Sequence, residues 1–183
     1  ILSNPEIDLI VEVIDDAAAS YKIVKAALQK GIPVVSGNKA MLARHLPELI
    51  DLQKKHNVAL LYDASSCGSI PVIRNLEEYY DNDLLLEVKG ILNGSSNYIL
   101  SRVFDHQESY DAALAQAQQL GYAETKDPGD DVDGRDACRK IAILSSLACG
   151  HHVYPDNIPA RGIRDVTVED VKAAEQLDCA IKL

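Results

Sequence analysis

The first 62 residues alternate short apolar runs with longer helical patterns, and this alternation limits the possible folds more than any other feature of the chain. Residues 7–14 (IDLIVEVI) and 33–36 (PVVS) are apolar and rich in β-branched side chains. Between them, residues 17–30 carry apolar side chains at helical spacing and are followed by Gly31, which suits a helix C-terminus. A crossover through one helix makes two strands parallel. The pattern therefore predicts a parallel α/β sheet.

The same alternation continues through residue 62. Residues 36–57 predict a helix that tolerates Pro47, and residues 58–62 predict a further strand. Together these segments resemble the later part of a doubly wound, Rossmann-like sheet. The Gly-rich turn that normally holds a dinucleotide is not among them, since no GxGxxG occurs in the sequence. Because a buried strand follows within a few residues of Ile1, we expect this fold to begin before the chain does, and to continue beyond its last residue.

After residue 69 the order of elements changes from α/β alternation to an α+β order. We therefore expect residues 1–69 to be the C-terminal part of a Rossmann-like domain that lacks its Gly-rich turn. Residues 70–183 are expected to form a substrate-binding, catalytic and dimerisation domain, incomplete at its C-terminus. The elements predicted in this second part are helices at 71–80, from 93 onward, at 109–121, from 134 to 150 and at 167–177, and strands at 84–92 and 180–183.

Charge and cysteine content exclude several classes of protein. A net charge of −10 and a pI near 4.9 disfavour a nucleic-acid or anionic-membrane surface. No apolar run approaches the roughly 20 residues that span a bilayer. The four scattered cysteines lack the close pairs of a zinc site and are expected to be free thiols. We expect a soluble, cytoplasmic protein whose partners are small molecules or protein.

An acidic loop precedes the helix predicted from residue 134. Residues 121–133 contain five carboxylates, and Asp136 and Lys140, four residues apart, share one face of the helix that follows. One cation facing many acceptors suits a site that holds an ammonium group and moves a proton. The alternative is a solvated loop with an ordinary ion pair worth about 0.3–0.5 kcal/mol. Spacing alone favours this alternative.

A second polar segment, NGSSN (residues 93–97), leads into a predicted helix. The unpaired N–H groups of a helix N-terminus can bind an anion such as a substrate carboxylate. The alternative is a plain helix cap, which is the commoner role of Ser at a helix start.

Four segments resemble motifs of the homoserine dehydrogenase family and occur in the same order. GILNGSSNYILSRV (residues 90–103) resembles GI(L/F)NGT(T/S)NYIL, and GYAETKDPGDDVDGRDACRKIAIL (residues 121–144) resembles GYAExDPxxDVxGxDAxxKxxIL. VVSGNKAMLA (residues 34–43) is similar to VVTxNKxxLA, and DASSCGSIPVI (residues 63–73) to EASxxxGIPII. The motifs cover nearly the whole chain and outweigh the preference that spacing alone gave to a solvated loop. ETKDP (residues 124–128) has one residue more than the ExDP of the family motif, and this insertion is expected to shift Glu124 relative to Lys140.

The resemblance implies interconversion of L-aspartate 4-semialdehyde and L-homoserine with NAD or NADP. It makes Lys140 the proton-transferring residue and places Lys39 between cofactor and substrate. Such a protein is expected to act as a homodimer or homotetramer. The residues that the resemblance places around the substrate are Glu124, Asp131, Asp136, Asn93, Gly94 and Ser95.

The family also carries a monovalent cation, sodium or potassium, bound by main-chain carbonyls of the turn after the third strand. The aligned carbonyls are those of Asp63, Ser66, Gly68 and Ile70. A different class of function stays open, namely a non-enzymatic relative that keeps the substrate domain as an interaction module. A relative of that kind would have no reason to retain Lys39, Lys140 and the acidic residues together.

Overall fold

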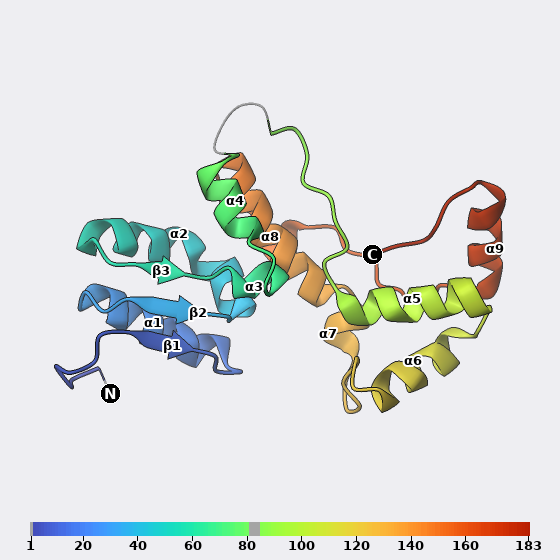
Figure 1. The fold of residues 1–183 in the computed structure, drawn as a ribbon, viewed down its shortest axis with the longest axis horizontal. Coiled ribbons are helices and arrows are strands. Elements are labelled where there is room, and N and C mark those ends of the chain that lie inside the picture. The colour runs from blue at the N-terminus through green and yellow to red at the C-terminus, as the bar shows by residue number, and fades with distance from the viewer. Residues whose placement is uncertain (1, 81–84) are drawn as a thin grey trace. The chain divides into compact units, whose positions relative to one another are not determined.

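The computed structural model describes residues 2–80 and 85–183 (Figure 1). The chain forms two compact units. Unit 1 comprises Ile1–Val88 and Arg139–Ile158, and unit 2 comprises Lys89–Cys138 and Pro159–Leu183. Within the described part of the chain, no helix is both long and apolar enough to cross a membrane. The expected division at residue 69 stays a prediction, because the compact units each join two separate segments.

Unit 1 is built on a parallel sheet in the order β1-β2-β3, as the alternation predicts. β1 is Ile10–Glu12, β2 is Val34–Ser36 and β3 is Leu60–Leu61. Each strand is shorter than its apolar run, because only the residues that pair with a neighbouring strand belong to the sheet. The register places Glu12 beside Ser36 at the carboxyl ends of the first two strands.

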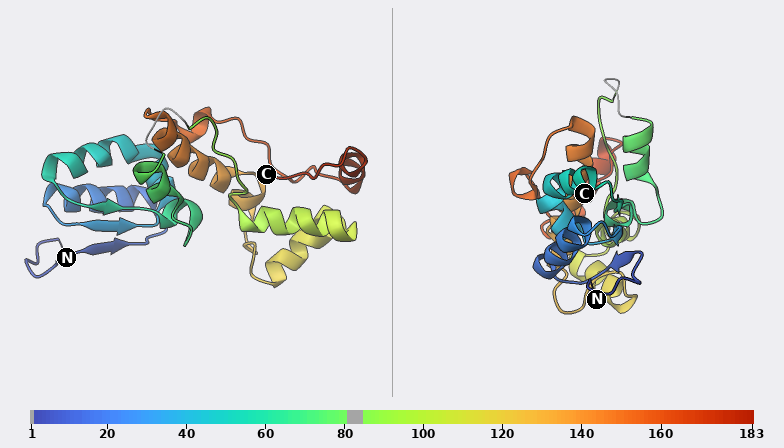
Figure 2. Two further views of the ribbon diagram at one scale, coloured as in Figure 1. Left: turned by 45° about the horizontal axis from the view of Figure 1, so that its top comes forward. Right: turned by 90° about the vertical axis from the view of Figure 1, so that its left-hand side faces the viewer.

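Two capped helices pack on one side of this sheet (Figures 1 and 2). They are α1, Ala17–Gln29, and α2, Lys39–His56. The side chain of Asp16 accepts hydrogen bonds from the first turn of α1, and that of Asn38 accepts one from the Met41 N–H in α2. Pro47 lies inside α2, as predicted. The core between helices and sheet consists of residues such as Val24, Leu28, Val34, Leu42, Leu46, Leu49 and Leu60.

Short helices complete unit 1. β3 leads into α3, Ala64–Cys67, and then into α4, Val72–Glu78. The segment expected to be a tight turn at 63–70 therefore contains one turn of helix. The long helix α8, Arg135–Cys149, belongs to unit 1 from Arg139 onward and is followed by a 3-10 turn, η1, Pro155–Asn157.

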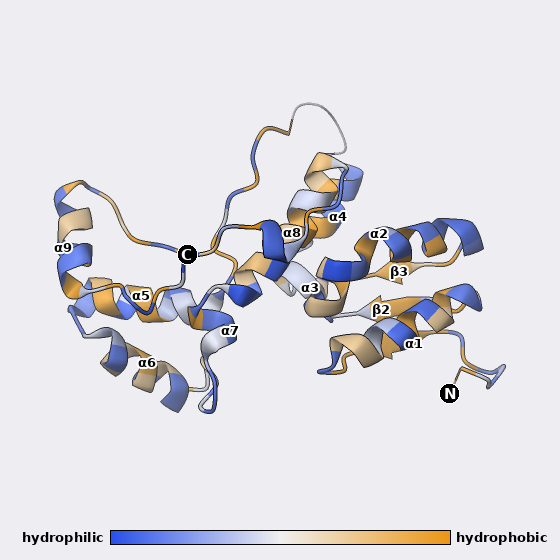
Figure 3. Ribbon diagram, turned by 180° about the vertical axis from the view of Figure 1, so that it is seen from behind, coloured by the Kyte–Doolittle hydropathy of each residue, from blue (hydrophilic) through white to orange (hydrophobic). Residues whose placement is uncertain are grey.

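Unit 2 is helical in its described elements. It contains α5, Gly94–His106, α6, Tyr110–Gln119, the short α7, Gly129–Val132, the start of α8, and α9, Val168–Gln176. Figure 3 shows both apolar and polar segments on α5 and α6, as expected of helices with one face in a core. That core includes Ile99, Leu100, Val103, Ala113, Ala117, Val132, Ile163 and Val171. The capping box predicted at Thr167 and Asp170 is confirmed.

Two predicted strands are wrong. Leu84 lies outside the described residues, but residues 85–92 belong to no strand in the part of the chain that the structure describes, and neither do residues 180–183. A period of two marks a segment that can form a strand, but a strand also needs a partner edge. The described elements of unit 2 are helices and offer no such edge.

The backbone of unit 2 packs so closely at Gly162 that a side chain there would collide with a neighbouring segment. A Cβ at this position would lie 2.5 Å from the Val132 carbonyl oxygen and 2.8 Å from the Asp133 Cα. The neighbouring Ile163 N–H donates to the same carbonyl, at 2.8 Å, so the two segments cannot separate cheaply. We expect Gly162→Ala to lower the free energy of unfolding by about 1–3 kcal/mol, as overpacking does, in urea denaturation.

Gly90→Ala is the matched control, because a Cβ there would meet only the Leu92 side chain at the ordinary distance of 3.8 Å. Equal stability of the two variants would show that the segment around Gly162 shifts without cost.

Candidate active site

A single amide group in unit 2 holds two carboxylates together. Asn93 Nδ2 donates to Asp131 Oδ1 at 2.7 Å and to Asp136 Oδ2 at 3.0 Å. Its Oδ1 accepts from the Ser96 N–H at 2.8 Å and so caps α5. Asn93 and Asp136 are 5% and 6% exposed. We call this arrangement the Asn93 clasp. It joins three residues that the sequence motifs associate with the substrate.

The Asn93 clasp has the chemistry of an ammonium-binding site. The amide uses both of its donor hydrogens on the carboxylates, which orients Asp131 on α7 and Asp136 on α8. A carboxylate has about four acceptor positions, so each can accept further hydrogen bonds beyond the one from Asn93. Charge-assisted bonds from an ammonium group to such oxygens are about twice as strong as neutral ones.

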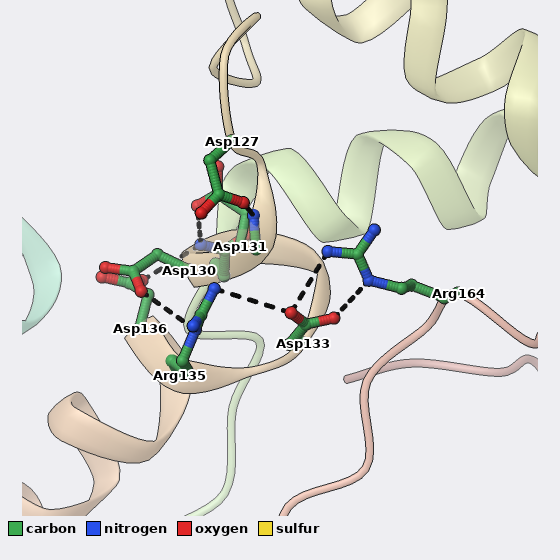
Figure 4. A network of polar contacts seen from close by, with 9 residues as sticks. Asp127, Asp130, Asp131, Asp133, Arg135, Asp136 and Arg164 are labelled. Atoms are coloured by element: carbon green, nitrogen blue, oxygen red, sulfur yellow. Dashed lines mark hydrogen bonds and ion pairs between the residues drawn. The ribbon is translucent and has the colours of Figure 1, made fainter.

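Three other acids of the loop hold the loop itself (Figure 4). Asp127 Oδ1 accepts from the Gly129 N–H at 2.9 Å. Arg135 Nε lies 3.1 Å from Asp130 Oδ1, and Arg135 Nη2 lies 3.6 Å from Asp133 Oδ2. The interpretation of the loop as purely structural is therefore right for these three residues, while Asp131 turns to the Asn93 clasp.

Arg164 is a partner of the loop that sequence patterns did not reveal. Both its Nε and its Nη2 bind the Asp133 carboxylate, the latter at 3.1 Å (Figure 4). This hydrogen-bonded guanidinium, with the charge of Arg135 adding to its effect, holds the pKa of Asp133 below its usual value. The two residues are 31 positions apart, and no local spacing rule connects them.

The remaining predicted residues of unit 2 lie outside the Asn93 clasp. Gly94 and Ser95 form the first turn of α5, and the Ser95 hydroxyl donates to the Tyr122 carbonyl. Glu124 is exposed, and its own carbonyl accepts from Gln118 Nε2 at 2.9 Å. Among the residues that the structure describes, the Glu124 carboxylate has no hydrogen bond or ion pair. The extra residue in ETKDP lies just after it.

Unit 1 contains the two predicted lysines. Lys39 is the first residue of α2, follows the N-cap Asn38 and is half-buried. Lys140 is half-buried on α8 and lies near Cys67 of α3. Burial raises the pKa of the Cys67 thiol, and the charge of Lys140 opposes this rise to a smaller extent. A thiol whose pKa is raised is less reactive, which favours a small space-filling role for Cys67 over that of a reactive thiol.

The turn after β3 contains an unusual buried hydroxyl. Ser66 Oγ is buried and has no hydrogen-bond partner in the described residues. The Asp63 carbonyl accepts from the Ser66 N–H at 3.3 Å, and the Ile70 carbonyl accepts from the Val72 N–H at 2.8 Å. The described residues hold no cluster of His, Cys, Asp and Glu side chains that could bind a metal ion. The turn offers main-chain carbonyl oxygens and the Ser66 hydroxyl as oxygen atoms.

Comparison with known families assigns both parts of the chain to family models. The model of the homoserine dehydrogenase family matches residues 71–183, a range that contains the whole Asn93 clasp. The chain belongs to the homoserine dehydrogenase family. The model of the homoserine dehydrogenase NAD-binding domain matches residues 1–63, which include the parallel sheet and Lys39. The resemblance drawn from the four motifs is confirmed.

Relatives and solved structures agree with this assignment. A homoserine dehydrogenase of Lactococcus lactis is 40% identical over 183 residues, which are 100% of this chain and 42% of that protein. The crystal structure of a homoserine dehydrogenase from Thiobacillus denitrificans matches 100% of this chain and 42% of its own, with a TM-score of 0.87 and 35% identity. A hyperthermophilic archaeal homoserine dehydrogenase in complex with NADPH matches 88% of this chain and 49% of its own, at TM-score 0.75 and 29% identity.

The chain spans about two fifths of the length of the curated homoserine dehydrogenases that it matches. The comparisons confirm the expected Rossmann-like sheet, because the fold of the whole chain recurs in solved homoserine dehydrogenases. They do not assign individual site residues.

The environment of Cys67 gives a test of where Lys140 lies. Because burial raises the thiol pKa, we expect iodoacetamide to alkylate Cys67 more slowly than the exposed Cys149 and Cys179 at pH 8. Lys140→Met removes the charge that opposes this rise, so alkylation of Cys67 should slow further. Peptide mass spectrometry measures each rate.

The two exposed cysteines are internal controls, and Lys140→Met should leave their rates unchanged. An unchanged rate at Cys67 in this variant would mean that the Lys140 ammonium does not lie beside α3.

Proposed function

We propose that this chain forms the central part of an NAD(P)-dependent homoserine dehydrogenase, which interconverts L-aspartate 4-semialdehyde and L-homoserine. The observation that carries the proposal is the Asn93 clasp. It brings together Asp131 and Asp136, which are 38 and 43 positions from Asn93, within the range that matches the family model. Three motif residues joined at one point support a shared role better than separate matches along the sequence do.

The substrate has an ammonium and a carboxylate group, and unit 2 offers complements to both. We assign the ammonium to the carboxylates of Asp131 and Asp136, with Glu124 as a third acceptor. The carboxylate is assigned to the start of α5 at Asn93, Gly94 and Ser95, where a helix N-terminus favours an anion. The buried position of Asn93 supports the assignment of the ammonium group, because a fixed amide holds the carboxylates of Asp131 and Asp136 in place before substrate binds.

The reacting carbon requires charge stabilisation and a proton. Hydride transfer to an aldehyde produces an alkoxide, and a lysine ammonium beside that oxygen can stabilise it and protonate it. We assign this role to Lys140. Lys140 is half-buried on α8, near Cys67. This supports the assignment, because partial removal of water strengthens the interaction of an ammonium with an alkoxide.

We assign the cofactor-side role to Lys39. It begins α2 directly after the carboxyl end of β2, and ligands of open α/β sheets bind at the carboxyl ends of the strands. NAD(P)H, when bound, supplies the hydride. Lys39 would contact cofactor and substrate from the first turn of the helix.

A monovalent cation, sodium or potassium, is proposed at the turn after β3. The carbonyls of Asp63, Ser66, Gly68 and Ile70 would bind it, and the buried Ser66 hydroxyl offers a further oxygen. A carbonyl oxygen has two lone pairs, so a hydrogen bond to Asp63 or Ile70 leaves one available to a cation.

The assembly we propose is a homodimer or homotetramer. From the sequence, Tyr79 and Tyr80 are predicted to be core or dimer-face residues rather than a platform for a nucleobase, and both are exposed in the structure. The core alternative is therefore wrong for these tyrosines, while exposed aromatic side chains suit a subunit interface.

Lys140→Arg in the full-length protein tests the proton-transfer role. Arginine keeps the charge but, with a pKa above about 12, releases a proton far less readily. We expect kcat for NAD(P)H-dependent reduction of aspartate semialdehyde to fall about 10²- to 10⁴-fold, with melting temperature and cofactor affinity nearly unchanged.

Lys172→Arg on α9 is the matched control and should leave kcat unchanged, because Lys172 is exposed. Turnover of Lys140→Arg within a few-fold of wild type would refute proton transfer by Lys140. No activity in the wild-type protein would favour the non-enzymatic alternative.

Glu124→Gln tests whether Glu124 contacts the substrate. Loss of a charged acceptor for the ammonium should raise the KM for the amino-acid substrate and leave the KM for NAD(P)H nearly constant. The exposed Glu175→Gln on α9 is the control and should change neither. Equal changes in both constants for Glu124→Gln would mean that the added residue in ETKDP has moved Glu124 away from the substrate.

A further inference from the structure

A carboxyl group is buried in the first strand of unit 1, at the end that faces Lys39. We infer that Glu12 is a positioning residue for Lys39, acting through Ser36 and Asn38. The inference rests on the proposed function, because Lys39 is the residue that would act on cofactor and substrate.

The burial of Glu12 needs a reason. Glu12 is 2% exposed and Ser36 is fully buried, and the two are paired across β1 and β2. An acidic side chain is costly in such a place unless hydrogen bonds compensate it. Glu12 Oε2 accepts from the Ser36 hydroxyl at 2.6 Å, and Oε1 accepts from the Ile14 N–H at 2.7 Å. Both carboxyl oxygens are therefore bound to the segments that leave the two strands.

The hydrogen bonds continue from Ser36 to the loop before α2. The Asn38 N–H donates to Ser36 Oγ at 3.2 Å, and Asn38 Nδ2 donates to the Ile14 carbonyl at 2.9 Å. The Gly37 N–H donates to the Glu12 carbonyl at 3.2 Å. Asn38 is thus tied by its side chain to Ile14, two residues after β1, and to the Glu12 carboxyl through one hydroxyl group.

Asn38 passes this constraint to the helix. Its Oδ1 accepts from the Met41 N–H at 3.0 Å, and its carbonyl accepts from the Leu42 N–H at 3.0 Å. Lys39 is the next residue, and its own N–H donates to the Gly37 carbonyl at 3.0 Å. The backbone on both sides of Lys39 is therefore fixed by groups that lead back to Glu12.

The place of the hydrogen bonds of Glu12 indicates that this residue positions Lys39 and does not merely stabilise the sheet. A valine at residue 12 would suit a buried strand of this kind without needing any partner. Among the residues that the structure describes, the Glu12 carboxyl instead has its partners at the carboxyl edge of the sheet, where ligands of such sheets bind. Supporting residues of this kind hold reactive groups in productive geometry, and a misplacement of 1 Å can cost about 10²-fold in rate.

The test is a pair of double-mutant cycles in the full-length protein. Glu12→Gln keeps the side-chain size but cannot accept from both Ser36 and Ile14, and Ser36→Ala removes the link to Asn38. We expect each to lower kcat by about 10- to 10²-fold. In a Lys39→Ala background we expect each to lower the residual kcat by less than about twofold, because there is no ammonium left to position.

A second measurement does not depend on turnover. Acylation of Lys39 by an amine-reactive ester, measured by peptide mass spectrometry, should accelerate at least about twofold in Ser36→Ala, because the half-buried lysine is no longer held. The exposed Lys172 is the internal control. We use Ser36→Ala for this measurement because it removes a single oxygen atom and disturbs folding less than Glu12→Gln does.

Glu48→Gln is the matched control for loss of a carboxylate next to α2. Glu48 lies on α2 and binds Lys25 and Tyr21 of α1, each at 2.6 Å, with no link to Asn38. It should leave kcat unchanged in both backgrounds.

Each outcome decides the inference. Equal losses of kcat with and without the Lys39 side chain would show that Glu12 only supports the fold. Wild-type kcat in both variants, together with unchanged acylation of Lys39 in Ser36→Ala, would equally overturn positioning. Absence of homoserine dehydrogenase activity in the wild-type protein would instead remove the proposed function, and the inference with it.

Discussion

A buried polar group needs hydrogen-bond partners, and in unit 2 the buried amide of Asn93 finds them on three different segments. Its oxygen caps α5, and its nitrogen holds Asp131 and Asp136. Because the amide is almost fully buried, none of these bonds can be exchanged for water without cost. The start of α5, Asp131 of α7 and the start of α8 are therefore joined by a single residue.

The acidic loop combines two functions that its sequence does not separate. Asp127, Asp130 and Asp133 stabilise the loop through a backbone N–H and two arginines, whereas another of its acids, Asp131, points to the Asn93 clasp. The acids of this loop therefore divide into those that bind the loop itself and Asp131, which binds the amide of Asn93. A loop held by ion pairs keeps its other carboxylate in place for a ligand, which is the arrangement that pre-organised binding sites require.

Unit 1 applies the same rule at the edge of its sheet. The carboxyl of Glu12 and the hydroxyl of Ser36 satisfy each other in the interior, and Asn38 carries their hydrogen bonds to the helix that begins with Lys39. In both units an asparagine therefore caps a helix and joins that helix to buried oxygen atoms. Both asparagines also stand directly at the residues that the family motifs mark.

The sequence by itself determined the elements whose causes are local. Apolar spacing predicted α1, α2, α5 and α6, the cap residue Thr167 predicted where α9 begins, and the order of four motifs predicted the family. Tertiary structure alone decided the pairings. Arg164 binds Asp133, which is 31 positions away, and Asn93 binds Asp136, which is 43 positions away. Glu12 binds Ser36, which is 24 positions away. Residues 85–92 have the pattern of a strand but lie beside no strand edge among the described elements. Periodicity and capping depend on neighbours within a few residues, whereas partners and strand edges exist only once distant segments have packed together.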